Sequence, residues 1–373
     1  MRKQRGKSFL AVLLLICLFC IPLTACGETG ILLKRRLLLQ GIGVDWKGNS
    51  YQITVQATQV EEGAGESTEV LTAQGRSVRD AFNNLTLKSG KEPLFSHHML
   101  LLFGETCARR GLNHVLDFFV RASGLNAQIS VAQAKGEANA LLTLQEQGQT
   151  LSAQSMIDLI ESGNANGKIP TVTLLDFSNQ LAGQGSPYLP LIGESDGKWE
   201  ALGMACFHKS FLVGSLLGED ARGALTLMEK VMRSVYAVPV EGLGTVSLDA
   251  ENLRTSVRIE ARGDALSFLF TVKGTASISA MDDLQQISPG PEAYGAILQA
   301  WKQQILQETS HALSQCIEKN ADVFSLTRRL LLADPAYWKE HHTAFEGNLS
   351  LASYRVQVDV SLLGTGQERT PTH

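Results

Sequence analysis

The chain has 373 residues, of which 33 are basic and 37 acidic, giving a formal net charge of −4 and a pI near 6.1. This length is typical of about two to three domains of roughly 150 residues each. Hydrophobic residues make up 44% of the chain and charged residues only 19%, which excludes general disorder. The acidic balance also argues against a nucleic-acid-binding protein, and six cysteines are too few for a disulfide-rich scaffold.

The N-terminus has the pattern of a lipoprotein signal peptide. Four basic residues and no acidic ones precede an uncharged apolar run from Phe9 to Ile21, which is shorter than the ~20 residues of a membrane-spanning helix. Residues 23–26 read Leu-Thr-Ala-Cys, a lipobox. We predict that residues 1–25 are removed and that Cys26 carries a diacylglycerol anchor. The alternatives are an ordinary cleaved signal peptide or an uncleaved anchor.

Cleavage at this point changes the charge and the cysteine count. Removing four of the 33 basic residues leaves 29 against 37 acidic ones, a net charge of −8. Besides Cys26, the mature chain keeps Cys107, Cys206 and Cys316, which lack the paired spacing of metal sites. Their apolar surroundings favour buried thiols, although one disulfide remains possible in an extracytoplasmic protein.

Residues 26–195 are predicted to form an N-terminal region of one or two subdomains. From periodicity and capping patterns we expect strands at 41–46, 51–56, 99–103 and 127–134, an exposed loop at 61–69, and helices from Ser77, at 105–121 and from Ser152 or Ser155 to Gly163. The predicted buried faces of the first two helices are Val78, Ala81, Phe82 and Leu85, and Ala108, Leu112, Val115, Leu116 and Phe119.

We place the main boundary near residues 194–197, followed by a C-terminal domain at 199–366 and a tail at 367–373. The expected elements are a hairpin of 202–207 and 211–216, a helix at 219–233, strands at 245–248, 256–261, 266–272 and 276–280, a long helix from Pro291 and a strand at 354–360. The mixed order predicts an α+β fold of several mixed α/β units with largely antiparallel sheets.

No motif predicts catalysis, a metal site or a cofactor. The pairs His97–His98 and His341–His342 are adjacent, so their side chains diverge. Gly41 and Gly43 form only a fragment of a dinucleotide motif, and nucleophile-elbow and phosphate-loop patterns do not occur. Asp176 and Asp322 are candidate acid/base groups, but we expect capping, salt bridging or solvation. The four tryptophans are too scattered for a stacking platform.

Several stretches, taken in order, resemble the Ger(x)C family, the lipoprotein C subunits of nutrient germinant receptors in spore-forming bacteria. They are the lipobox, residues 41–45, 51–56 and 96–105, Arg121, the segment from 168–177 through 187–190, residues 202–214 with Arg222 and Gly223, residues 321–324 and 334–339, and residues 364–366. The resemblance covers about residues 24–366. It departs after the lipidated cysteine, where the family commonly has Trp-Asp and this chain has Gly27 and Glu28.

The resemblance implies a non-enzymatic subunit without a cofactor, anchored by lipid to the outer face of the cytoplasmic (spore inner) membrane. It implies integral-membrane A and B subunits as partners in a receptor that starts germination, and it does not imply a germinant pocket in this subunit. The alternative function is that of an extracytoplasmic solute-binding lipoprotein of a transporter, which should have two similar α/β lobes. An extracytoplasmic hydrolase is the third hypothesis.

Overall fold

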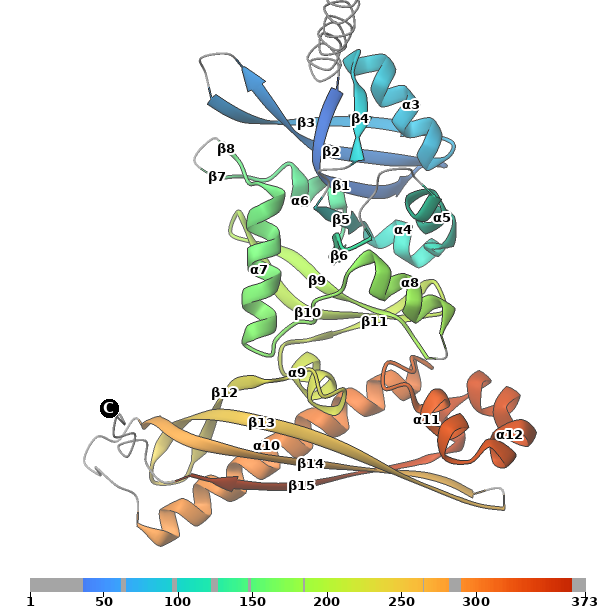
Figure 1. Cartoon of the computed structure of the whole chain (residues 1–373). Helices are drawn as coiled ribbons and strands as arrows, with labels where there is room; N and C mark the ends of the chain where they lie inside the picture. The colour runs from blue at the N-terminus through green and yellow to red at the C-terminus, as the bar shows by residue number, and fades with distance from the viewer. Residues whose placement is uncertain are drawn as a thin grey trace, which may run out of the picture.

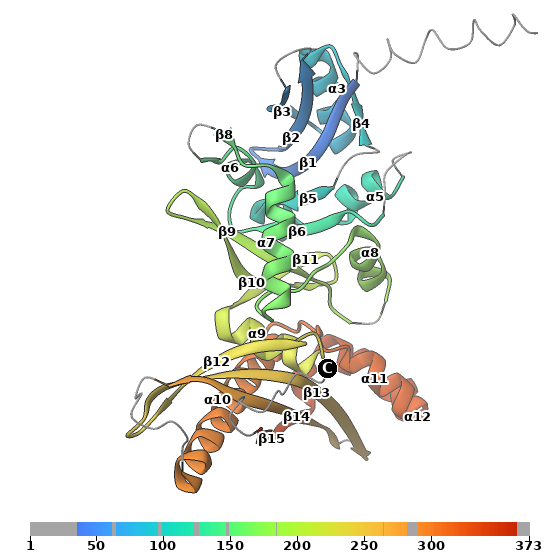
Figure 2. The same cartoon turned by 60° about the vertical axis from the view of Figure 1, so that its left-hand side comes forward.

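The computed structural model describes residues 36–363 except 62–64, 96–98, 122–126, 147–148, 184, 264 and 282–289. Two main sheets lie one beyond the other along the molecule, a nine-stranded sheet nearer the N-terminus and a four-stranded sheet at the opposite end (Figures 1 and 2). A short two-stranded sheet lies beside the first. The α+β fold class predicted from the sequence is confirmed.

The first sheet is mixed. Its strands are β1 (Arg36–Lys47), β2 (Ser50–Glu61), β3 (Gly65–Gly75), β4 (Glu92–Leu94), β5 (Leu100–Phe103), β6 (Ser130–Ala134), β9 (Tyr188–Ser195), β10 (Lys198–His208) and β11 (Phe211–Leu217). They are ordered β11-β10-β9-β6-β5-β1-β2-β3, with β4 beside β1. The central pairs β1–β5, β5–β6 and β6–β9 are parallel, whereas the outer hairpins are antiparallel.

Helices cover both faces of this sheet, because the side chains of a strand alternate between its two faces. Leu101 and Phe103 of β5 pack with α3 (Val78–Ser89), α4 (Glu105–Arg110), α5 (Asn113–Arg121) and α8 (Leu174–Ala182). Leu100 and Leu102 pack on the other face with α6 (Ala138–Leu142) and α7 (Ala153–Ala165). The short strands β7 (Gln145–Glu146) and β8 (Gln149–Thr150) lie between these two helices in the chain.

Two N-terminal predictions are wrong in detail. The loop expected at 61–69 is mostly strand, because β3 starts at Gly65 and pairs with β2 in a long hairpin. The helix expected at 105–121 is broken at Gly111, whose φ of 101° interrupts the helical path. Both buried faces are nevertheless confirmed, since every residue predicted for them is buried.

The second sheet has the order β12-β13-β14-β15 and packs on a long helix. Its elements are α9 (Gly218–Leu227), β12 (Arg233–Val240), β13 (Gly244–Arg262), β14 (Ala265–Met281), α10 (Pro291–Glu318), α11 (Leu326–Ala333), α12 (Pro335–Gly347), the 3₁₀ turn η3 (Leu349–Leu351) and β15 (Ser353–Leu362). The predicted long helix and closing strand are confirmed. The helix expected at 219–233 is shorter, because the alternating residues from Arg233 onward pair with β13.

The strand β10 connects the two halves. Its Ala205 and Phe207 belong to the core of the first sheet, whereas its Met204 and Cys206 belong to the core of the second. The predicted boundary near residues 194–197 falls at the turn of the β9–β10 hairpin, inside the first sheet. The four strand segments expected between 245 and 280 are two long strands, β13 and β14. The division into domains stays a prediction.

Candidate interaction site at the junction of the two sheets

The predicted lipid-anchor residue, Cys26, lies outside the described residues, as does the pair His97–His98. The assignment of Cys26 therefore stays a prediction. No helix in the described part of the chain is long and apolar enough to cross a membrane.

The other residues singled out from the sequence do not come together at one site. His341 and His342 lie on α12, where their Nδ1 atoms are 3.0 and 3.2 Å from the carbonyl oxygens of Tyr337 and Trp338. Asp176 completes the capping box of α8 with Thr173. In the described ranges no group of three His, Cys, Asp or Glu side chains is arranged to hold a metal ion.

The tryptophans and cysteines are mostly packing residues. Trp46 packs on Tyr51, Trp199 donates to the Leu141 carbonyl, Trp301 packs on Tyr236, and Trp338 lies beside His342. Cys107, Cys206 and Cys316 are buried free thiols, as the sequence favours. Burial raises the pKa of Cys107 to about 12, so this thiol stays protonated.

Asp45, at the end of the Gly-rich β1 motif, also has a structural role. Its carboxylate accepts hydrogen bonds of 2.8 Å from the backbone N–H groups of Ala138 and Asn139 at the start of α6. Burial raises its pKa, and these two hydrogen bonds oppose the shift. The carboxylate thus holds α6 against the first sheet.

Two segments that carry the family resemblance meet at the junction of the sheets. The Ser186 N–H donates to the Asp322 carbonyl and the Asp322 N–H donates to the Ser186 hydroxyl, both at 2.8 Å. The Asp322 side chain accepts from the N–H groups of Leu326 and Thr327 at 2.6 and 2.9 Å and from the Thr327 hydroxyl at 2.6 Å. Capping, one of the three structural roles expected for Asp322, is therefore its observed role.

The pKa of Asp322 is raised to about 6. Burial is the main cause, and the hydrogen bonds from Thr327 and Leu326 oppose it. Asp322 is only 5% exposed. Its carboxyl forms no ion pair with another described residue. The group therefore titrates within the core of the junction.

A cleft of about 690 Å³ opens beside this junction. Its walls come from α8, the segment around Ser186, the end of α9 and the start of α11. Three cationic side chains, Lys230, Arg328 and Arg329, line it against one acidic side chain, Asp176, which already caps α8. The cleft can accept an acidic group of a ligand or partner. The sequence alone did not point to it, because its walls come from segments about 140 residues apart.

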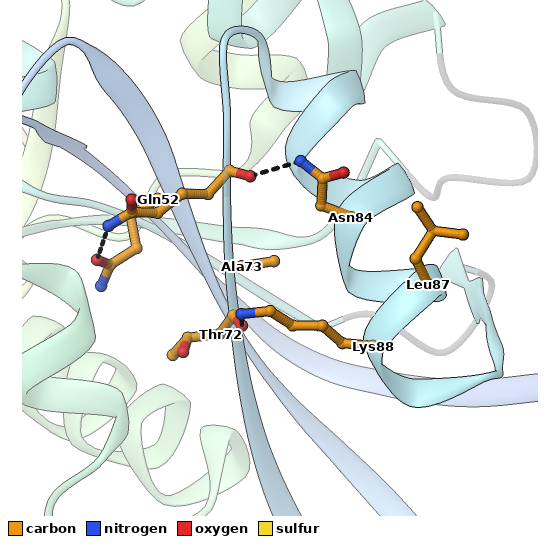
Figure 3. A pocket seen from close by; sticks show the side chains of 7 residues that line it. Gln52, Thr72, Ala73, Asn84, Leu87 and Lys88 are labelled. Atoms are coloured by element: carbon orange, nitrogen blue, oxygen red, sulfur yellow. Dashed lines mark hydrogen bonds between the residues drawn. The ribbon is translucent and has the colours of Figure 1, made fainter.

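A second hollow of about 430 Å³ lies between α3 and the β2–β3 hairpin (Figure 3). The polar groups that line it form hydrogen bonds with one another. Asn84 Nδ2 donates to the Gln74 carbonyl at 2.8 Å, and Lys88 Nζ donates to the Thr72 carbonyl at 3.3 Å. Gln74 Nε2 donates to Gln52 Oε1 at 3.2 Å. These contacts attach α3 to β3 and leave the hollow a less suitable ligand site than the junction cleft.

Comparison with known proteins identifies relatives along almost the whole chain. The model "Spore germination protein N-terminal domain" matches residues 31–194, and "Spore germination B3/ GerAC like, C-terminal" matches residues 202–366. The putative spore germination protein YfkR of Bacillus subtilis (strain 168) is 24% identical over 87% of this chain and 85% of its own length. The spore germination protein GerQC of Bacillus cereus is 20% identical over 83% and 86%.

A solved structure has a similar fold. The crystal structure of the GerBC protein matches with a TM-score of 0.60 and 15% identity, over 87% of this chain and 97% of that one. At this identity the similarity establishes the fold alone.

Proposed function

Because the chain belongs to the GerAC-like family of spore germination proteins, we propose that it is the lipid-anchored, non-catalytic C subunit of a nutrient germinant receptor. In this proposal Cys26 holds it on the outer face of the cytoplasmic membrane, which becomes the spore inner membrane. Its role is in receptor assembly or signalling with the membrane subunits A and B. The ordered match of both family models across residues 31–366 carries the proposal.

Three residues in the segments that resemble the family have structural roles, which supports an assembly subunit. Asp45, Asp322 and Arg222 each hold one element of this chain to another. Residues that instead formed a catalytic site would converge on one cavity. The two sheets differ in strand number and pairing, whereas the alternative solute-binding function predicts two similar lobes, so the structure favours the receptor subunit.

The function is tested by deleting the gene in the spore-forming host and measuring dipicolinate release after nutrient addition. We expect release to be lost and to be restored by the wild-type gene. Unchanged release in a strain without a redundant paralogue would contradict the proposed function.

The anchor is tested separately with Cys26→Ala. We expect loss of acyl labelling and release of the chain from the membrane fraction, because the thiol that carries the lipid is absent. Cys20→Ala, six residues upstream in the apolar run, is the matched control and should label as the wild type does. Acyl labelling that persists in Cys26→Ala would refute the site.

A further inference from the structure

The strand β15 forms an open edge of the second sheet. It pairs with β14 over ten residues on one side, and in the described part of the chain no strand pairs with its other side (Figure 1). Exposed edges of this length are usually protected by Pro, Lys or a bulge. The opposite edge strand, β12, contains Pro239, whereas β15 contains no Pro or Lys and its register with β14 is unbroken.

The sequence of β15 is self-complementary about Gln357. If a second β15 lies antiparallel with Gln357 opposite its own copy, Arg355 lies opposite Asp359 of the second copy, and Asp359 opposite Arg355. Both side chains are exposed, and neither forms an ion pair within 4 Å with another described residue. Opposite charges in directly facing positions stabilise a strand pair.

The other face of β15 is complementary in the same register. Val356 lies opposite Val358 of the second copy, and Tyr354 opposite Val360. Tyr354 and Val356 are only half-buried, and together with Leu313 and Ile317 of α10 they line an open groove of about 270 Å³. Valine side chains of a second copy would enter this groove and cover its apolar wall.

We propose that the open edge of β15 binds β15 of a second copy of this chain, antiparallel and with the two-fold axis at Gln357. The two four-stranded sheets then form one continuous eight-stranded sheet. Because both copies use the same surface, the contact closes at a dimer and does not propagate into a filament. A strand from an unrelated protein can also add to an open edge, but it would not require the symmetric placement of Arg355 and Asp359.

A cysteine at the axis tests this geometry. Facing residues in an antiparallel pair have Cα atoms about 4.5–5.5 Å apart, within disulfide range. We expect the full chain carrying Gln357→Cys, oxidised in membranes with copper and air, to give a band at twice the monomer mass on a non-reducing gel. Ser256→Cys is the control, exposed on β13 of the same sheet, and should give at least tenfold less. The native thiols at 107, 206 and 316 are buried.

Absence of the band, equal bands in both variants, or a cross-link to a protein of different mass would overturn the proposal. Charge exchange in the Gln357→Cys chain gives the second measurement. Arg355→Asp alone or Asp359→Arg alone places like charges opposite each other twice per dimer, and we expect cross-linking to fall about tenfold. The double exchange restores opposite charges and should restore the band. A double variant as weak as the single ones would refute the paired register.

Discussion

The buried ion pair between α9 and α10 gives the sharpest prediction about stability. Arg222 Nε donates to Glu308 Oε2 at 2.9 Å, and Arg222 Nη2 donates to Oε1 of the same carboxylate. The Glu308 side chain is 4% exposed and that of Arg222 is 11% exposed. The guanidinium also lies 4.2 Å from the Tyr236 ring and donates to the Val235 carbonyl at 3.0 Å.

Glu308→Ala leaves the guanidinium buried without its carboxylate. Breaking a buried pair in this way costs about 3–5 kcal/mol, because the remaining charge keeps only the exposed Glu219 carboxylate, 3.7 Å away. The double variant Arg222→Met/Glu308→Leu removes both charges and keeps the volume, so we expect it to lie within about 1–2 kcal/mol of the wild type. The loss of the Tyr236 contact, about 1 kcal/mol, is part of that difference.

The measurement is urea unfolding of the full chain, followed by tryptophan fluorescence and far-UV circular dichroism. With a slope of about 3 kcal/mol/M, the single variant should shift the midpoint down by about 1–1.7 M. Trp301 packs beside Tyr236 at 5.9 Å and reports on this core. A loss below about 1 kcal/mol in Glu308→Ala, or a double variant as unstable as the single, would refute the reasoning.

Substitutions at Asp322 and beside Asp45 test the other two buried carboxylates. The pKa of Asp322 is about 6 when folded, above its ordinary 3.8, so its contribution to stability is full below about pH 3.8 and is lost as the pH rises through 6. The difference in unfolding free energy between the wild type and Asp322→Asn should therefore fall by about 3 kcal/mol between pH 4 and 7. Thermal melting of both proteins at each pH would measure this difference. A difference that does not change with pH would contradict the prediction. Gly104→Ala places a methyl group 1.8 Å from Asp45 Oδ1 and should cost about 1–3 kcal/mol. Gly295→Ala has open space in α10, so it should stabilise by about 1 kcal/mol, and equal effects of the two would refute the steric argument.

Local periodicity predicted the helices and hairpins whose residues are close in sequence. Ser77 caps α3 and its four predicted residues are buried, because a 3.6-residue repeat depends only on neighbouring turns. The break at Gly111 was missed because the apolar spacing continues across it. The strand β3 was missed because its Gly and Glu residues suggest a loop, whereas its pairing with β2 comes from the hairpin.

Contacts between distant segments limited what could be predicted of the site. A cap is one of the three roles expected for Asp322, and it needs only residues four and five positions later. Its contact with Ser186 joins residues 136 positions apart, and no local pattern encodes that proximity. The family resemblance marked both segments, but it did not reveal that they meet. The parallel centre of the first sheet was missed for the same reason, because its pairs are joined through intervening helices.

The shared strand β10 joins the cores of the two family-matched regions. Alternate residues of a strand point to opposite faces, so Phe207 is buried in the first core while Cys206 is buried in the second. The buried thiol of Cys206 lies near that of Cys316 on α10 and raises its pKa, and the Asp322–Ser186 hydrogen bonds also join the two halves. Separating the halves would expose both faces of one strand to water, at about 25 cal/mol per Å² of apolar surface.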